Sequence, residues 1–136
     1  MRIVACVCAI CAVCGSAAAQ PNDRLLDAIR QVESGGDCGL VGDGGKAIGP
    51  YQIHREYWQD AVAFDKRLGG TYEDCRSEAY ARRVVRAYLT RYGKGASDEA
   101  MARIHNGGCG ILRRVGTSAW NRTTTYWRKV QRAMRL

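Results

Sequence analysis

Seven of the fifteen residues from 35 to 49 are glycine, and this segment limits the possible fold more than any other part of the chain. Glycine loses more backbone freedom on folding than any other residue, so such a density excludes a helix and favours tight turns. Two short apolar pairs, Leu40-Val41 and Ala47-Ile48, lie on either side of an Asp43-Gly44 turn. This pattern predicts a small β-hairpin.

Helical periodicity is found on both sides of the glycine-rich segment. A first helix is predicted from a cap at Asp23 to a stop at Gly35-Gly36, because apolar residues recur there at i, i+1, i+4 and i+7. Further helices are predicted over residues 51–64, as one or two pieces beginning after Pro50, and over 77–92, 97–104 and 124–134. The expected fold class is therefore mainly α with a small β-hairpin (α+β).

The first nineteen residues have the pattern of a secretory signal peptide. Arg2 precedes an apolar run from Ile3 to Cys14, and three alanines, residues 17–19, stand before Gln20. The run is shorter than the roughly 20 apolar residues that span a bilayer, so we expect cleavage and secretion without stable membrane insertion. Residues 20–136 are then expected to form a single extracellular domain.

Cleavage of this signal would remove four of the seven cysteines. Cys38, Cys75 and Cys109 remain, so one intramolecular disulfide is expected in an oxidising compartment, and the sequence does not select among the three pairings. These cysteines and the two histidines lack the CxxC or HxxxH spacing of a zinc site. We therefore predict no metal and no other cofactor.

The charge of the chain limits its partners. The signal contains one of the 21 basic residues and none of the 13 acidic residues, so the mature protein carries a net charge of +7. Such a surface is attracted to polyanions. For a secreted protein, the anionic bacterial surface is a more plausible partner than nucleic acid. The sequence gives no indication of the oligomeric state.

Glu33 is the strongest candidate for chemistry because of its place in the first predicted helix. It follows Leu26 by seven residues and Ile29 by four, so it lies on or beside the buried stripe. Burial and the negative end of the helix dipole both disfavour the carboxylate anion. We predict that Glu33 stays protonated and acts as a general acid. The alternative is an ordinary, partly exposed surface glutamate.

A second carboxyl group is available on the glycine-rich turn. Retaining glycoside hydrolysis uses two carboxyl groups about 5 to 5.5 Å apart. Asp43 could fold back over the helix end and face Glu33, where the backbone amides of the turn would favour its ionised form as nucleophile or electrostatic partner. The alternative is that Asp43 only forms the turn. Asp37, four residues from Glu33, is a weaker candidate.

Six short motifs follow one another along nearly all of the mature chain. They are Val32-Glu33-Ser34-Gly35, Gly49-Pro50-Tyr51-Gln52-Ile53, Tyr57-Trp58, Arg91-Tyr92, Ala102-Arg103-Ile104-His105-Asn106-Gly107-Gly108 and Tyr126-Trp127. In this order they resemble the invertebrate-type lysozyme family, also called the destabilase family. The resemblance implies a lysozyme-like fold and hydrolysis of the β-1,4 bond between N-acetylmuramic acid and N-acetylglucosamine in peptidoglycan. The family's catalytic glutamate falls on Glu33 and its catalytic aspartate on Asp43.

We also expect substrate-binding residues within these motifs. Tyr51 and Tyr57 offer apolar ring faces for stacking on sugars, as does Trp58, with core packing as the alternative for each. The further substrate-binding residues are predicted to be Gln52, His105 and Asn106. A structural role at a helix end is the alternative for His105.

The chain departs from the family pattern in two ways. Family members usually carry more cysteines, so this molecule is expected to be less cross-linked. Some members are credited with an isopeptidase activity that uses a serine and a lysine. Ala47 and His54 stand where these residues are expected, so this activity is not predicted here.

Two other functions remain open at the level of sequence. The Glu-Ser-Gly-Gly helix end, the following glycine-rich loop and Gln52 also resemble lytic transglycosylases, which act with a single glutamate. The net charge is also compatible with a non-enzymatic cationic antibacterial protein. The products released from peptidoglycan would separate the two enzymes, because a transglycosylase leaves anhydromuramic ends and a muramidase leaves reducing ends.

Overall fold

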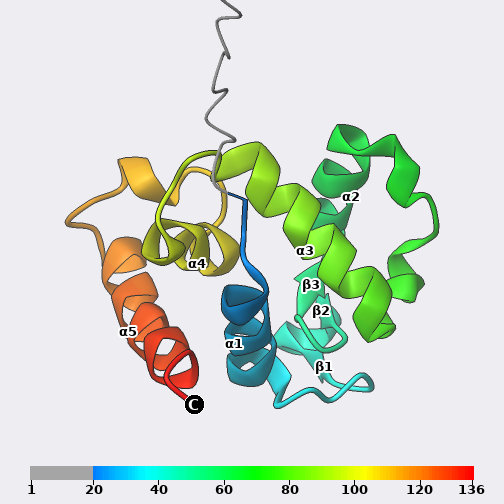
Figure 1. Cartoon of the computed structure of the whole chain (residues 1–136), viewed down its shortest axis with the longest axis horizontal. Helices are drawn as coiled ribbons and strands as arrows, with labels where there is room; N and C mark the ends of the chain where they lie inside the picture. Colours follow the sequence, from blue (N-terminus) through cyan, green and yellow to red (C-terminus); the bar gives the residue numbers. More distant parts are fainter. Residues whose placement is uncertain (1–19) are drawn as a thin grey trace, which may run out of the picture.

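The computed structural model describes residues 20–136; the predicted signal peptide, residues 1–19, and its four cysteines lie outside the described residues. Within this part of the chain, five α-helices accompany one three-stranded antiparallel sheet (Figure 1). The helices are α1 (Asp23–Ser34), α2 (Arg55–Phe64), α3 (Glu78–Tyr92), α4 (Asp98–Gly107) and α5 (Ser118–Ala133), and the strands are β1 (Val41–Gly42), β2 (Ala47–Ile48) and β3 (Ile53–His54). The predicted fold class is confirmed.

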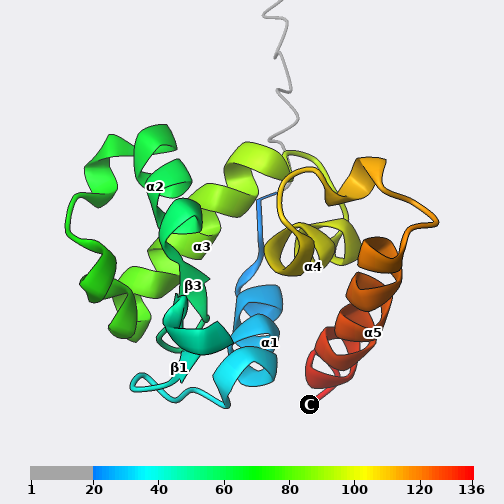
Figure 2. The ribbon, with the colours of Figure 1, turned by 180° about the vertical axis from the view of Figure 1, so that it is seen from behind.

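Helix α1 lies between the sheet and α5 in both views of the ribbon (Figures 1 and 2). Its cap is Asn22, whose side chain accepts a hydrogen bond from the Leu25 amide at 2.8 Å, so the predicted cap Asp23 is instead the first helical residue. At the other end Gly35 has a φ of 63°, a left-handed conformation suited to glycine. The helix therefore ends where predicted, with Glu33 in its last turn.

The glycine-rich segment forms the predicted hairpin. Strand β1 pairs with β2, placing Val41 opposite Ile48 and Gly42 opposite Ala47, and a short 3₁₀ turn, η1 (Asp43–Gly45), connects them. Leu40 lies outside the strand, but its carbonyl accepts a hydrogen bond from the Gly49 amide at 2.9 Å. The two-residue strands are thus extended by one further backbone contact.

The third strand, β3, is a feature that we did not predict. A helix beginning after Pro50 was expected, but α2 begins at Arg55, and β3 pairs with β2 so that Ile53 lies opposite Ile48. The reason is the backbone between the two strands: Gly49 has a φ of 75° and Gln52 a φ of 49°, and both angles are incompatible with a right-handed helix. The prediction of a helix over residues 51–54 is wrong.

The bounds of the remaining helices agree with the predicted bounds to different degrees. Helix α3 begins within one residue of its predicted start, and α4 runs three residues beyond its predicted end. Helix α5 begins six residues before its predicted start, because the Thr117 side chain accepts a hydrogen bond from the Trp120 amide and so caps the helix early. The run of threonines that follows is tolerated in the helix because Thr123 is buried and bonded to Arg103.

The core is continuous and receives buried apolar side chains from all five helices and from the sheet. Leu26 and Ile29 of α1 and Leu89 of α3 are among its fully buried members. Trp58 packs against this core and donates its indole N–H to the Tyr80 hydroxyl at 2.9 Å, so it is not free for sugar stacking. No helix within residues 20–136 combines the length and the apolar character needed to cross a bilayer.

The three cysteines within the described range are all free, so the expected disulfide is not present. Cys75 is fully buried, and burial raises the pKa of its thiol to about 12. Cys38 and Cys109 are exposed. Thiol chemistry requires the thiolate, which is disfavoured at such a buried position, so Cys75 acts as an apolar core residue.

All seven tyrosines of the sequence lie in the described part, and burial is the largest cause of a raised pKa in each of them. Tyrosines of the unfolded chain ionise near pH 10. The native state therefore holds these protons more tightly, and the stability that they contribute is complete below about pH 10 and is lost as the pH rises through the native values. We expect the urea midpoint to fall steeply between about pH 10 and about pH 12.

The measurement pairs urea unfolding with the near-ultraviolet absorbance of phenolate during an alkaline titration. The absorbance should rise together with unfolding, in a cooperative step. A gradual rise near pH 10 in a protein that stays folded would contradict the prediction.

Candidate active site

A cleft of about 380 Å³ brings together the last turn of α1, the hairpin and the C-terminal end of α4. Its lining comprises Glu33, Asp43, Ala47, Gln52, His54, His105 and Asn106. Five of the seven residues predicted for the site therefore meet in one place, although they are spread over more than seventy positions of the chain. The two candidate carboxyl groups lie on different elements that face the same cleft.

Glu33 is the less accessible of the two carboxyl groups, with 18% of its side chain exposed. The Tyr126 hydroxyl donates a hydrogen bond to its Oε1 atom at 2.8 Å, and His105 Nε2 lies 3.3 Å from the same oxygen. Burial, and then the negative charge of Glu33, raise the pKa of Tyr126 well above its ordinary value. The phenol therefore keeps its proton and remains a donor to Glu33.

His105 lies behind Glu33 with 4% of its side chain exposed. Its Nδ1 atom is 3.0 Å from the Tyr57 hydroxyl, and the ring of Tyr57 stacks on that of Tyr88 at a centroid distance of 3.6 Å. Burial raises the pKa of Tyr57 well above its ordinary value, followed by the effects of Tyr88 and Glu33. Tyr57 thus contacts the site through His105 and does not line the cleft, contrary to its predicted role in stacking on sugars.

Asp43 has the opposite environment, with 63% of its side chain exposed. Its Oδ2 atom lies 3.2 Å from His54 Nε2 on the neighbouring strand. The backbone of Asp43 has a φ of 50°, a left-handed conformation that costs energy for most residues but that aspartate adopts more readily. Water reaches this carboxylate, whereas Glu33 is mostly enclosed, so the two groups suit different chemical roles.

Gln52 lines the cleft and also holds the hairpin together. Its Nε2 atom donates to the carbonyls of Leu40 at 3.2 Å and Gly49 at 2.9 Å. Position 42 must be glycine for this arrangement, since a Cβ atom there would lie 2.2 Å from the Gln52 side-chain oxygen. The Gln52 side chain therefore helps to fix the shape of the hairpin that carries Asp43, in addition to any contact with a ligand.

Two residues predicted near the site lie elsewhere. Tyr51 is fully buried, and its hydroxyl accepts a hydrogen bond from Arg82 at 3.1 Å, so the prediction that it binds substrate is wrong. The turn after Gly49 directs this side chain into the core. Asp37 accepts a hydrogen bond from the Gly39 amide at 2.8 Å within its own loop and does not line the cleft.

Two residues of the site were missed by the sequence analysis. Tyr126 lies 93 positions from Glu33, and its motif gave no sign that the hydroxyl would reach the carboxyl group. His54 was considered only as a departure from the family pattern. Its place on β3, a strand that was itself not predicted, explains why its pairing with Asp43 could not be foreseen.

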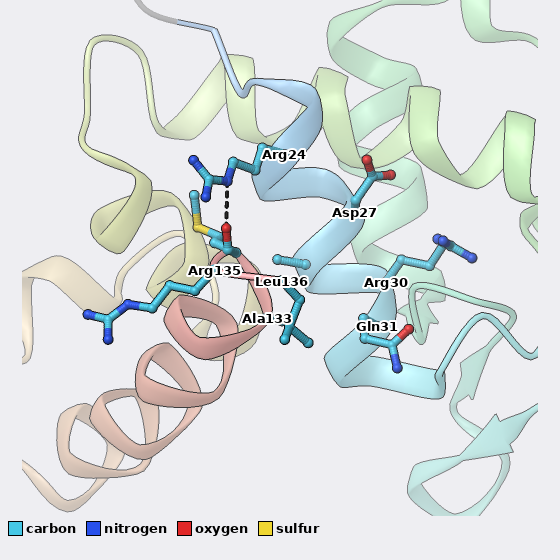
Figure 3. A pocket seen from close by; sticks show the side chains of 9 residues that line it. Arg24, Asp27, Arg30, Gln31, Ala133, Arg135 and Leu136 are labelled. Atoms are coloured by element: carbon cyan, nitrogen blue, oxygen red, sulfur yellow. Dashed lines mark hydrogen bonds between the residues drawn. The ribbon is translucent and has the colours of Figure 1, made fainter.

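A larger cleft of about 570 Å³ lies between α1 and the end of α5 (Figure 3). Its charged lining is mostly arginine, from Arg24, Arg30 and Arg135, and it contains neither Glu33 nor Asp43. The Arg24 side chain is already engaged, since its Nε atom donates to the backbone carbonyl of Met134. Acid catalysis needs the paired carboxyl groups, so we take the smaller cleft as the candidate site.

Comparison with known proteins gives one family. The family model described as Destabilase matches residues 22–133. Lysozyme 1 of Crassostrea virginica is 35% identical over 119 residues, which cover 81% of this chain and 58% of that protein. The lysozyme of Ostrea edulis is 34% identical over 119 residues, covering 81% of this chain and 79% of the relative. The chain thus spans little more than half the length of the Crassostrea virginica protein.

Solved structures of similar proteins agree with this result. The crystal structure of Tapes japonica lysozyme matches with a TM-score of 0.60 and 27% identity, covering 81% of this chain and 88% of that chain. The Meretrix lusoria lysozyme in complex with Aeromonas hydrophila PliI matches with a TM-score of 0.57 and 32% identity, covering 76% and 88%. Both matches cover three quarters or more of this chain.

Proposed function

Because this chain belongs to the destabilase family, as the motifs predicted, we propose that it is a lysozyme that hydrolyses the β-1,4 bond between N-acetylmuramic acid and N-acetylglucosamine in bacterial peptidoglycan. The single observation that carries the proposal is that a mostly enclosed Glu33 and an exposed Asp43 line the same cleft. Glycosidases need two carboxyl groups in unlike environments, because one must hold a proton while the other is ionised.

In the proposed mechanism Glu33 is the general acid. It donates its proton to the glycosidic oxygen as the bond from that oxygen to C1 of the muramic acid breaks. Positive charge then develops at C1 and the ring oxygen, and the Asp43 carboxylate either stabilises it or forms a covalent bond to C1. Water completes the reaction by adding to C1 and giving one proton to the Glu33 carboxylate, which restores the acid.

The surrounding groups support these two roles. When Glu33 loses its proton, the resulting carboxylate keeps the hydrogen bond from Tyr126 to Oε1, which stabilises the ionised form. His54 lies beside Asp43 and would limit the positions that this carboxylate can adopt. Asn106 lines the same cleft and offers amide donors and acceptors for a sugar, whereas little of the His105 ring is accessible to a ligand.

The decisive experiment is digestion of purified peptidoglycan, with the products identified by mass spectrometry. A lysozyme releases muropeptides with reducing N-acetylmuramic acid ends. Anhydromuramic ends would instead identify a lytic transglycosylase, and the absence of soluble fragments would contradict both enzymes.

Replacement of Asp43 by asparagine should lower the rate of hydrolysis by about 10²-fold, because a fixed charge near the transition state contributes on this scale. The fold should be unchanged, since asparagine also tolerates a positive φ. The rate is measured as turbidity loss of peptidoglycan suspensions, with Asp37→Asn as the matched control in the same loop. If Asp43→Asn kept the wild-type rate, Asp43 would be a turn residue only.

We further propose that the protein is secreted and acts at the anionic bacterial surface, for which the signal-like segment 1–19 and the net charge of +7 for residues 20–136 are the supporting observations. Attraction between exposed charges is screened by salt. Binding to bacterial walls should therefore weaken as the ionic strength rises.

A further inference from the structure

His105 is held at both of its ring nitrogens. Nδ1 lies 3.0 Å from the Tyr57 hydroxyl, and Nε2 lies 3.3 Å from Glu33 Oε1. With 4% of its side chain exposed, the imidazole is nearly cut off from water and depends on these two partners. The state of His105 is therefore decided by the two groups that it contacts.

The Tyr57 hydroxyl has one proton to donate. Burial raises the pKa of Tyr57, so the phenol stays protonated throughout the neutral range. Among residues 20–136, the hydrogen bond of this hydroxyl is made with His105 Nδ1. A buried hydroxyl proton without an acceptor is unfavourable, so Tyr57 donates to Nδ1, and a neutral imidazole then carries its own proton on Nε2.

This tautomer determines which oxygen of the Glu33 carboxyl group carries the acidic proton. His105 Nε2, which carries the ring proton, lies 3.3 Å from Oε1, and the Tyr126 hydroxyl donates a hydrogen bond to the same oxygen at 2.8 Å. A proton on Oε1 would lie against the Nε2 proton and would compete with the hydrogen bond from Tyr126, so Oε1 is a poor place for it. The acidic proton of Glu33 is thus directed to its other oxygen, Oε2.

We propose that Tyr57 is a positioning residue for the reaction: it holds His105 as the neutral Nε2–H tautomer and thereby keeps the acidic proton of Glu33 on Oε2, the oxygen free to transfer it. The proposal rests on the proposed role of Glu33 as general acid. During the reaction the Oε2 proton passes to the glycosidic oxygen as the C1–O bond breaks, and water later returns a proton to Oε2. His105 keeps its Nε2 proton in both steps.

The Tyr57–His105 hydrogen bond also disfavours a second protonation state, in which His105 is cationic and Glu33 is ionised. A doubly protonated His105 would form an ion pair with a Glu33 carboxylate, and the acidic proton would be lost. Protonation of Nδ1 removes the acceptor of the Tyr57 hydroxyl in a buried place, so Tyr57 opposes this state.

The groups around this pair come from every neighbouring element. Three residues lie around the His105 ring: Glu33 of α1, Tyr57 of α2 and Tyr126 of α5. On the far side of Tyr57 are Tyr88 of α3 and Cys75 of the 3₁₀ turn η3 (Tyr72–Arg76). The sheet, with its turn η1, contributes Asp43 and His54 to the lining of the same cleft. The Asp43 carboxylate is mostly exposed, so water and salt screen its charge.

The test uses nitrogen NMR of the wild-type protein and of Tyr57→Phe. The sequence contains two histidines, so a His54→Gln variant assigns the signals of His105. We expect the wild type to show one protonated nitrogen, Nε2, and one unprotonated nitrogen, Nδ1, at neutral pH. In Tyr57→Phe the Nδ1 atom loses its donor and can take a proton, so we expect a larger fraction of His105 to have both nitrogens protonated at neutral pH than in the wild type.

The rate of peptidoglycan hydrolysis should follow the same change. In Tyr57→Phe we expect kcat/KM to fall about tenfold across the pH range, because the proton that the pair shares moves from Glu33 to His105 and this transfer within the pair does not depend on pH. Tyr88→Phe is the matched control, since it removes a hydroxyl from the partner ring of the same stack without touching His105.

Three results would overturn the proposal: an Nδ1–H tautomer in the wild type, a doubly protonated His105 at neutral pH, or a Tyr57→Phe protein with an unchanged His105 spectrum. The wild-type spectrum decides the question even if Tyr57→Phe does not fold. A wild type that shows the Nε2–H tautomer and yet releases no fragments from peptidoglycan would remove the proposed function and leave the tautomer assignment standing.

Discussion

Replacement of Glu33 by glutamine is expected to reduce the release of soluble fragments from peptidoglycan by about 10²- to 10⁴-fold, the usual contribution of a positioned general acid. Glutamine has nearly the shape of glutamic acid but cannot donate a proton of the required acidity. Its side-chain oxygen can still accept the hydrogen bond from the Tyr126 hydroxyl, so the local structure should persist. Fragment release is measured by mass spectrometry and by loss of turbidity.

A suitable control is Glu73→Gln, which removes an exposed carboxylate outside the cleft, where Glu73 pairs with Arg76 at 3.1 Å. Exposed pairs contribute little to stability, so this variant should match the wild type in both rate and unfolding. A Glu33→Gln protein that hydrolyses peptidoglycan at the wild-type rate would refute the assignment of Glu33. If that variant killed bacteria with undiminished potency while releasing no fragments, the non-enzymatic cationic function would gain support.

The largest expected effect on stability comes from Gly49→Ala. A Cβ atom at this position would lie 2.2 Å from the Cys75 carbonyl oxygen and 3.0 Å from its carbonyl carbon, both in the backbone of the neighbouring 3₁₀ turn η3. The φ of 75° adds the strain of a left-handed conformation. We expect the free energy of unfolding to fall by about 3 kcal/mol or more, from the backbone strain and the steric overlap together.

Gly44→Ala separates these two causes. Gly44 has a similar φ of 61°, but a Cβ atom there would meet no heavy atom within 4 Å. Its substitution should therefore cost only the backbone strain, about 1 kcal/mol. Urea unfolding followed by tryptophan fluorescence gives both values. Equal losses in the two variants would show that the contact between Gly49 and Cys75 is not limiting.

The sequence predicts the parts of the site that follow from local patterns. The spacing of Glu33 from Leu26 and Ile29 places it beside the buried stripe of α1, and 18% of its side chain is exposed in the structure. The glycine spacing likewise predicts the hairpin and brings Asp43 to the same cleft. These features depend on helical period and turn chemistry, which are properties of short segments.

Other parts depend on contacts between distant segments or on an unusual backbone. Gln52 has a φ of 49° and its side chain bonds two carbonyls of the hairpin, and nothing in its immediate sequence indicates such a conformation. Tyr51 is consequently buried and not available to a sugar. The bond from Tyr126 to Glu33 joins residues 93 positions apart, which no periodicity can reveal.

The hydrogen bond from Tyr126 of α5 to Glu33 makes the site sensitive to a cut in the loop before α5. The cleft is lined by residues that precede position 107. The hydroxyl that donates a hydrogen bond to Glu33 nevertheless belongs to α5 (Ser118–Ala133), which follows the exposed loop that contains Arg114 and Val115. A protease that cuts this loop would leave every residue lining the cleft in place. If α5 then separated, Glu33 would lose its hydrogen bond from the Tyr126 hydroxyl. Cleaved molecules would then retain the cleft but hydrolyse peptidoglycan slowly.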